Sequence, residues 1–190
     1  MLRPDYPIRT TRLLLRPYAT TDVAAMLDIY SRPDVVRYLY EEPRTEDNVR
    51  AMIEDRLDNV ALAKDGDYLS LAIALPEYPD TAIGTAMLHW TSEEHRQGEV
   101  GYTLHPDHSG KGYATEATRT LVDLGFRDTG LHRLVGRLDA RNIASRRVLE
   151  KCGMRVEAHL VENEWVKGEW VSEIVCAVLR SEWEQAQLLD

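Results

Sequence analysis

The hydrophobic positions along the chain follow two periods, one typical of α-helices and one typical of β-strands. Helical spacing marks four segments: one that begins at Thr21 and Asp22, and residues 45–63, 112–127 and 142–151. Strand-like runs between turn signals mark seven others: residues 9–16, 68–75, 82–90, 99–104, 133–139, 155–162 and 170–179. The chain is therefore predicted to contain both helices and a sheet.

The order of these elements indicates how they are arranged. After two helical segments, strands joined by short turns precede an alternation of strand, helix, strand, helix and strand. Such an order predicts an α/β (α+β) fold around one mixed sheet. The turn-rich stretches at residues 64–67 and 76–80 are too short to link two domains. We therefore expect residues 1–190 to form a single domain.

Composition and cysteine content indicate the cellular compartment in which the protein is expected. Hydrophobic residues make up 44% of the 190 residues and charged residues 29%, which is typical of a folded globular protein. The sequence has no run of ~18 apolar residues and no signal-peptide layout at its start. Its two cysteines, Cys152 and Cys176, cannot form a disulfide framework or a four-ligand zinc site. We expect a reduced, cytoplasmic protein with no membrane span and no metal.

Charge narrows the class of partner. The chain has 23 Lys and Arg residues against 32 Asp and Glu residues, a formal net charge of -9. Proteins that bind nucleic acid usually present a basic face to the phosphates, whereas an acidic protein attracts cations. We therefore expect no nucleic-acid partner and a preference for cationic substrates such as amines.

The clearest candidate chemistry lies in a glycine-rich loop where a predicted strand runs into a predicted helix. Gly110 and Gly112 allow close approach of the backbone to a ligand, and Lys111 adds a positive charge. The helix N-terminus adds N–H groups, so the loop suits a phosphate. A P-loop is excluded because His105 replaces its first glycine, and a dinucleotide fingerprint because Thr115 replaces its last.

Four motifs resemble those of the GNAT superfamily of N-acetyltransferases, in matching order and spacing. They are GKGYATEA at residues 110–117, LHRL at 131–134, NIAS at 142–145 and LEKCGM at 149–154. With the opening TRLLLRP at residues 11–17, the chain is similar to the RimJ/RimL-like branch, which includes ribosomal-protein N-terminal acetyltransferases. The resemblance implies a mostly antiparallel central sheet of about seven strands, splayed between the fourth and the fifth and flanked by helices.

The resemblance also implies an activity. The expected function is transfer of an acetyl group from acetyl-CoA, the cosubstrate, to a primary amine by direct attack in a ternary complex. The acceptor would be a protein N-terminal α-amine or a small cationic metabolite. The alternative is a catalytically silent acyl-CoA-binding sensor or interaction module. A monomer and a homodimer are both compatible with the sequence.

By the same resemblance, twelve residues would bind CoA. The backbone of the predicted strand at Tyr102, Thr103 and Leu104 would pair with pantetheine. The side chain of Asn142 would bond to pantetheine or cap the following helix, and Ser145 would approach the sulfur. The pyrophosphate is expected on seven consecutive residues: Ser109, Gly110, Lys111, Gly112, Tyr113, Ala114 and Thr115. Ser109 replaces the Gln or Arg of the family motif, which predicts a somewhat weaker hold on CoA.

Three residues are candidates for proton transfer. Ser145 would donate a hydrogen bond to the leaving sulfur or hold a water that delivers the proton. Glu164 matches the position of a carboxylate proposed as the base in this branch, and Glu99, at the start of the splayed strand, is the alternative. For an N-terminal α-amine, with a pKa of ~8, water is a third possibility for the base.

Contacts with the acceptor are expected from the first two helices and the last hairpin. The aromatic candidates are Tyr38, Tyr40, Trp90 and Trp165.

Overall fold

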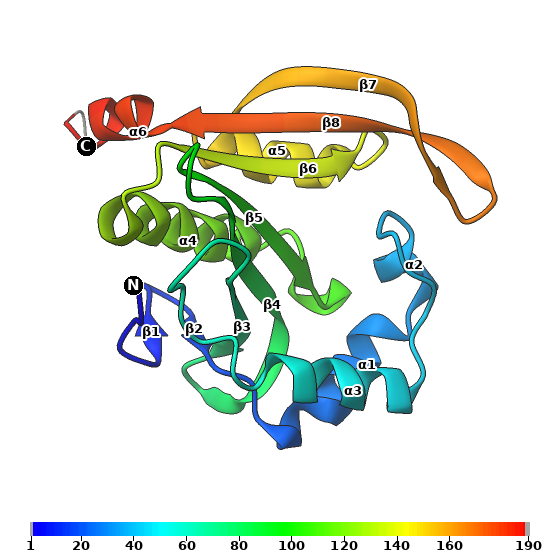
Figure 1. Cartoon of the computed structure of the whole chain (residues 1–190). Coiled ribbons are helices and arrows are strands. Elements are labelled where there is room, and N and C mark those ends of the chain that lie inside the picture. Colours follow the sequence, from blue (N-terminus) through cyan, green and yellow to red (C-terminus); the bar gives the residue numbers. More distant parts are fainter. Residues whose placement is uncertain (1, 189–190) are drawn as a thin grey trace.

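Within residues 2–188, the part of the chain that the computed structural model describes, eight strands form one sheet in the order β1-β2-β3-β4-β5-β6-β8-β7 (Figure 1). The strands are β1 (Ile8–Arg9), β2 (Leu14–Arg16), β3 (Tyr68–Leu75), β4 (Tyr78–Ser92), β5 (Gln97–Leu104), β6 (Arg133–Asp139), β7 (Arg155–Val166) and β8 (Glu169–Leu179). Neighbouring strands are antiparallel except β5 and β6, which are parallel. The prediction of a mixed, mostly antiparallel sheet is confirmed.

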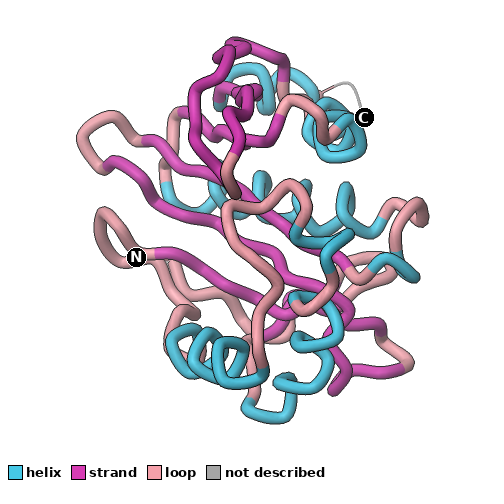
Figure 2. Tube along the Cα trace, turned by 90° about the vertical axis from the view of Figure 1, so that its right-hand side faces the viewer, coloured by secondary structure: helices cyan, strands magenta, loops and turns pink. Residues whose placement is uncertain are grey.

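Helices cover both faces of this sheet, as Figure 2 shows from the side. They are α1 (Val23–Tyr30), α2 (Pro33–Val36), α3 (Glu46–Arg56), α4 (Tyr113–Thr129), α5 (Ile143–Lys151) and α6 (Arg180–Gln187), with 3-10 turns at Thr20–Asp22 and Pro106–His108. In the described part of the chain, none of them has the length and apolar character needed to cross a membrane.

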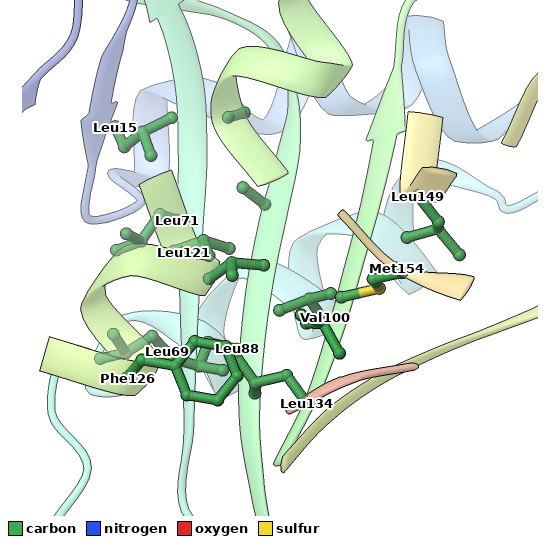
Figure 3. Packing of buried hydrophobic residues seen from close by; sticks show 14 of the residues in the cluster. Leu15, Leu69, Leu71, Leu88, Val100, Leu121, Phe126, Leu134, Leu149 and Met154 are labelled. Carbon is green, nitrogen blue, oxygen red and sulfur yellow. The ribbon is translucent and has the colours of Figure 1, made fainter. Parts of the chain in front are cut away.

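Two hydrophobic cores fill opposite faces of the sheet because side chains alternate along each strand. On one face, Leu71 of β3 and Leu88 of β4 pack with Leu121 and Phe126 of α4 (Figure 3). On the other face, Ala72, the next residue of β3, packs with apolar side chains of α1 and α3. The sheet thus separates α4 from the two N-terminal helices.

The strands β5 and β6 diverge after a short stretch of pairing. Among the described residues, their register partners are only Gln97–Glu99 and Arg133–Val135, although β5 continues to Leu104 and β6 to Asp139. As a result, β6, β8 and β7 lie at an angle to the rest of the sheet (Figure 1). These two strands are the fourth and fifth predicted from the sequence, so the predicted splay is confirmed.

The segment 9–16, predicted as one strand, forms two. In the turn between β1 and β2, Thr10 N donates to Leu13 O at 3.0 Å and the Thr10 hydroxyl accepts from Leu13 N at 2.9 Å. The threonine side chain thus replaces strand pairing with local hydrogen bonds. The prediction of a single strand here is wrong, which explains why residues 2–188 hold eight strands instead of about seven.

The helix predicted over residues 45–63 is shorter, because α3 ends at Arg56. Asn59 Nδ2 donates to the carbonyl of Asp55 at 2.9 Å and so satisfies an acceptor in the last turn. Beyond this point the chain is irregular, and Leu62 pairs with Leu2 as an isolated bridge. Asp and Asn favour such local bonds over continued helix, a preference that the apolar spacing does not show.

Candidate active site

The splay between β5 and β6 opens into a cleft of about 780 Å³. Eleven of the twelve predicted CoA-binding residues line it: Tyr102, Thr103, Leu104, Ser109, Gly110, Gly112, Tyr113, Ala114, Thr115, Asn142 and Ser145. Lys111 is exposed and lies outside the lining. Within residues 2–188, no three His, Cys, Asp or Glu side chains gather as a metal site requires.

The cleft has two sides because the side chains of β5 point alternately to the two faces of the sheet. Tyr102 points to the face of α4 and α5, and its hydroxyl donates to Ser145 Oγ at 3.1 Å. We call this half, with the glycine loop and Asn142, the loop side. Glu99 lies on the opposite face, and we call that half, lined also by Tyr30, Arg56, Ser70, Thr85 and Met87, the α1 side.

The loop before α4 has the geometry of an anion site. Gly110 and Gly112 take left-handed φ angles of 75° and 84°, and Gly112 is the N-cap of the helix. No side chain of residues 2–188 caps this end, and the first intrahelical bond runs from Glu116 N to Gly112 O at 3.0 Å. The N–H groups of the preceding helical residues, Tyr113 to Thr115, therefore remain available to a phosphate.

Sequence reasoning missed Arg12, which joins this loop to the N-terminal segment. Its Nε donates to Glu116 Oε2 at 2.7 Å, and its Nη1 donates to the carbonyl of Lys111 at 2.9 Å. The guanidinium also lies 5.0 Å from the ring centroid of Tyr113. Arg12 thus places a long cationic side chain at the loop, where Ser109 supplies only a short hydroxyl. The only sequence signal was its place in the opening motif.

Of the two predicted bases, Glu99 lines the cleft. Burial raises the pKa of the Glu99 carboxyl above its ordinary value, and the neighbouring Arg137 partly opposes that shift. The Arg137 Nε lies 3.7 Å from Glu99 Oε2. A carboxylate in a cleft with a raised pKa is suited to accept a proton near neutral pH.

Glu173 of β8 is a buried carboxylate that the sequence did not indicate, because a single glutamate in a strand is usually exposed. It is 5% exposed. Its Oε2 accepts from Arg137 Nη1 at 3.2 Å and from Asn163 Nδ2 at 3.3 Å. Glu173 therefore holds Arg137 in the place where this arginine faces Glu99.

The last hairpin contributes less to the cleft than predicted. Glu164 is exposed on β7 and lies outside the lining, as does Trp165, whose side chain is 60% exposed. Trp90 packs against the core on the α4 face instead. Tyr38 and Tyr40 do line the cleft, so half of the predicted aromatic acceptor contacts lie in it.

The start of α5 positions Ser145, which forms a hydrogen-bonded pair with Tyr102. Asn142 Oδ1 accepts from Ser145 N at 3.0 Å, which confirms the predicted N-cap. Burial raises the pKa of Tyr102 to about 12, so its phenol stays protonated and donates to Ser145. Because Ser145 Oγ already accepts this bond, its own hydroxyl proton is free to point at a ligand in the cleft.

Three comparisons with known proteins bear on this site. Residues 12–155 match the family described as acetyltransferase (GNAT) domain. The uncharacterized N-acetyltransferase YnaD of Bacillus subtilis (strain 168) is 30% identical over 176 residues, which cover 93% of this chain and 98% of YnaD.

Solved structures agree. A GNAT-family acetyltransferase from Bacillus anthracis superposes with a TM-score of 0.81 at 29% identity, over 92% of this chain and 98% of that chain. Spermidine N-acetyltransferase from Vibrio cholerae, in complex with CoA and spermine, has a TM-score of 0.76 at 22% identity, over 92% of this chain and 99% of that chain. At this identity the second likeness shows the fold alone.

Proposed function

Because the chain belongs to the GNAT acetyltransferase family and is an N-acetyltransferase, we propose that it transfers the acetyl group of acetyl-CoA to a primary amine by direct attack in a ternary complex. One observation carries this proposal: a single cleft joins an anion-binding loop, a hydrogen-bond donor pair and a carboxylate of raised pKa. The opening motif TRLLLRP and Ser145 favour the RimJ/RimL-like branch.

The loop side fits the cosubstrate, which supplies the acetyl group as an activated thioester. Gly110 and the free N–H groups at the start of α4 suit its pyrophosphate. Beyond Glu99, the edge of β5 that faces the splay has no partner strand among residues 2–188. An unpaired strand edge offers N–H and C=O groups to the amides of a ligand such as pantetheine.

The residues on the two sides of β5 then divide the proton transfers. Transfer forms a C–N bond and breaks the C–S bond, so the amine loses one proton and the sulfur gains one. Glu99, on the α1 side, accepts the proton of the amine. Ser145, supported by Tyr102 on the loop side, donates a hydrogen bond to the departing sulfur, and solvent protonates the thiolate after release.

The direct test is thiol release from acetyl-CoA with a panel of amines, with the product identified by mass. The panel contains short peptides with a free N-terminus, spermidine and simple alkylamines. Release with at least one amine, with acetyl on its nitrogen, supports the proposal. Binding of acetyl-CoA without release for any acceptor, peptide or small molecule, would favour the silent sensor instead.

Ser145→Ala is expected to lower kcat about tenfold, the worth of one hydrogen bond, with the KM for acetyl-CoA nearly unchanged. Tyr102→Phe should have a similar effect because Tyr102 acts through Ser145. The double variant should lose no more than either single variant, since both changes break one chain of bonds. Steady-state kinetics checks this, and independent, multiplying losses would show that the two hydroxyls do not form one unit.

Arg12→Ala is expected to raise the KM for acetyl-CoA about tenfold while kcat changes less than threefold, because charge-assisted hydrogen bonds that fix the loop are lost. Arg9→Ala is the matched control, since Arg9 is an exposed arginine of the same segment. Initial rates at a saturating amine concentration measure both variants. An equal rise in KM for Arg9→Ala would mean that the effect comes from general surface charge and not from the contacts of Arg12 with the loop.

A further inference from the structure

The inner end of the α1 side holds polar groups that the proposed transfer does not use. Ser70 on β3 is 1% exposed, and within residues 2–188 its Oγ has no hydrogen-bond partner. Arg56, the last residue of α3, lines the cleft beside it, together with Tyr30 and Thr85. A buried hydroxyl without a partner is uncommon in a folded protein, and because Ser70 lines the cleft, a ligand or water in the cleft can supply that partner.

The charges along the α1 side set Arg56 apart. Each carboxylate that lines the cleft has an arginine within 4.0 Å. The pairs are Arg32–Asp34, Arg44–Glu41, Arg137–Glu99 and Arg141–Asp139.

Arg56, by contrast, has no carboxylate oxygen within 4.0 Å in the described chain. Its neighbours are phenols: burial would lower the pKa of Arg56, but Tyr30 and Tyr18 more than offset this and raise it. Two phenol oxygens cannot satisfy the five N–H donors of a guanidinium. The cleft is therefore lined by a permanent cation that has no counter-ion among the described residues.

We propose that Arg56 and Ser70 bind a carboxylate of the acceptor, so that the substrate is a zwitterion whose amine meets Glu99. This inference rests on the proposed acetyl transfer and names the substrate class of that site. A polyamine would bring a second cation against Arg56. An amino acid or short peptide instead places its amine at the Glu99 carboxylate and its own carboxylate at the Arg56 cation.

The sheet register sets the length of such an acceptor. Ser70 is paired with Met87, and Met87 is paired with Gly101 of β5. Two strand spacings, roughly 10 Å, thus separate Ser70 from the strand where the amine reacts. Gly101 adds no side chain to this floor, and a Cβ there would approach Met87 Cε to 3.4 Å. The fitting acceptor carries its carboxylate several bonds from the amine, as in a dipeptide or a six-carbon amino acid.

Three acceptors of equal length separate the alternatives: 6-aminohexanoate, hexylamine and 1,6-diaminohexane. Thiol release gives kcat/KM for each. We expect 6-aminohexanoate to exceed hexylamine about tenfold, as a hydrogen-bonded charge pair permits, and the diamine to be the poorest. Equal values, or a preference for the diamine, would overturn the inference and leave the proposed acetyl transfer standing.

Variants assign the preference to Arg56. Arg56→Met should bring the ratio of kcat/KM for 6-aminohexanoate over hexylamine close to one, and Arg56→Lys should restore part of it. Arg44→Met, which breaks the pair with Glu41 nearby, should keep the ratio. Because the ratio compares two acceptors on one variant, a partial loss of folded protein cancels. A ratio unchanged by Arg56→Met contradicts the inference.

A binding measurement distinguishes failure of the carboxylate site from failure of the proposed acetyl transfer. If no amine releases thiol, acetyl transfer is refuted. Calorimetric titration of the CoA-saturated protein with 6-aminohexanoate then tests the carboxylate site by itself. Binding that Arg56→Met weakens tenfold still supports a carboxylate site, and absence of binding refutes it.

Discussion

Gly112→Asp is expected to abolish measurable binding of acetyl-CoA, with Kd raised at least 100-fold, or ~2.7 kcal/mol. The new carboxylate would lie at the N-terminus of α4, where the pyrophosphate is proposed to sit, and would repel it. Its Cβ would come within 3.2 Å of Arg12 Nη2, so the side chain would also compete for that guanidinium. Calorimetric titration with acetyl-CoA measures the effect.

Gly130→Asp is the matched control. Gly130 ends the same helix with a left-handed φ of 75°, and a Cβ there meets nothing within 4 Å among the described residues. The substitution therefore brings the same backbone strain and the same charge, but far from the loop. Its Kd should stay within threefold of the unmodified protein. Equal binding by Gly112→Asp, or no binding by the unmodified protein, would mean that the loop does not hold CoA.

Glu99→Gln is expected to lower kcat about 100-fold at pH 7, the range of general-base catalysis. In the unmodified enzyme the carboxylate is the active form, so the rate rises as the pH rises through the pKa of Glu99. Because burial raises that pKa above its ordinary value, the rise should fall at a higher pH than for an exposed glutamate. In the variant this acid limb should disappear and only the titration of the amine should remain.

Glu164→Gln distinguishes the two predicted bases. Glu164 is exposed and lies outside the lining of the cleft, so its loss should change kcat less than threefold and leave the pH profile intact. A full pH–rate profile of both variants, with the same amine, makes the comparison. If Glu164→Gln removed the acid limb and Glu99→Gln did not, the roles would be reversed.

Local signals explain why the loop side was predictable. Gly110 and Gly112 stand between a strand and a helix whose boundaries the sequence marks, and the N-cap role of Asn142 depends on the three residues that follow it. The prediction that these segments lie together came from their resemblance to a known family. The cleft lining confirms that they share one space.

The site residues that the sequence did not reveal depend on contacts between distant segments. The choice between Glu99 and Glu164 turns on where the last hairpin lies, which the two-residue period of β7 does not reveal. Arg12 contacts a glutamate 104 residues away in the sequence. Arg56 is a helix-ending arginine in the sequence, and only the folded structure shows that no carboxylate of residues 2–188 lies within 4.0 Å of it. The end of α3 and the turn between β1 and β2 were missed because side-chain bonds of Asn59 and Thr10 override the apolar pattern.

The short pairing of β5 with β6 has a mechanical consequence. Three register pairs join one half of the sheet to the other, and Gly98 lies in the middle of them. A Cβ on Gly98 would come within 2.9 Å of both His89 O and Leu131 Cδ1, so the two halves meet there without spare room. Hydrogen bonds of the sheet therefore join the two halves over a short length only, and the hydrophobic core that contains both Val100 and Leu134 holds them together. A cosubstrate bound along the splay, as we propose, would add backbone pairing at the edge of β5 where the sheet has none.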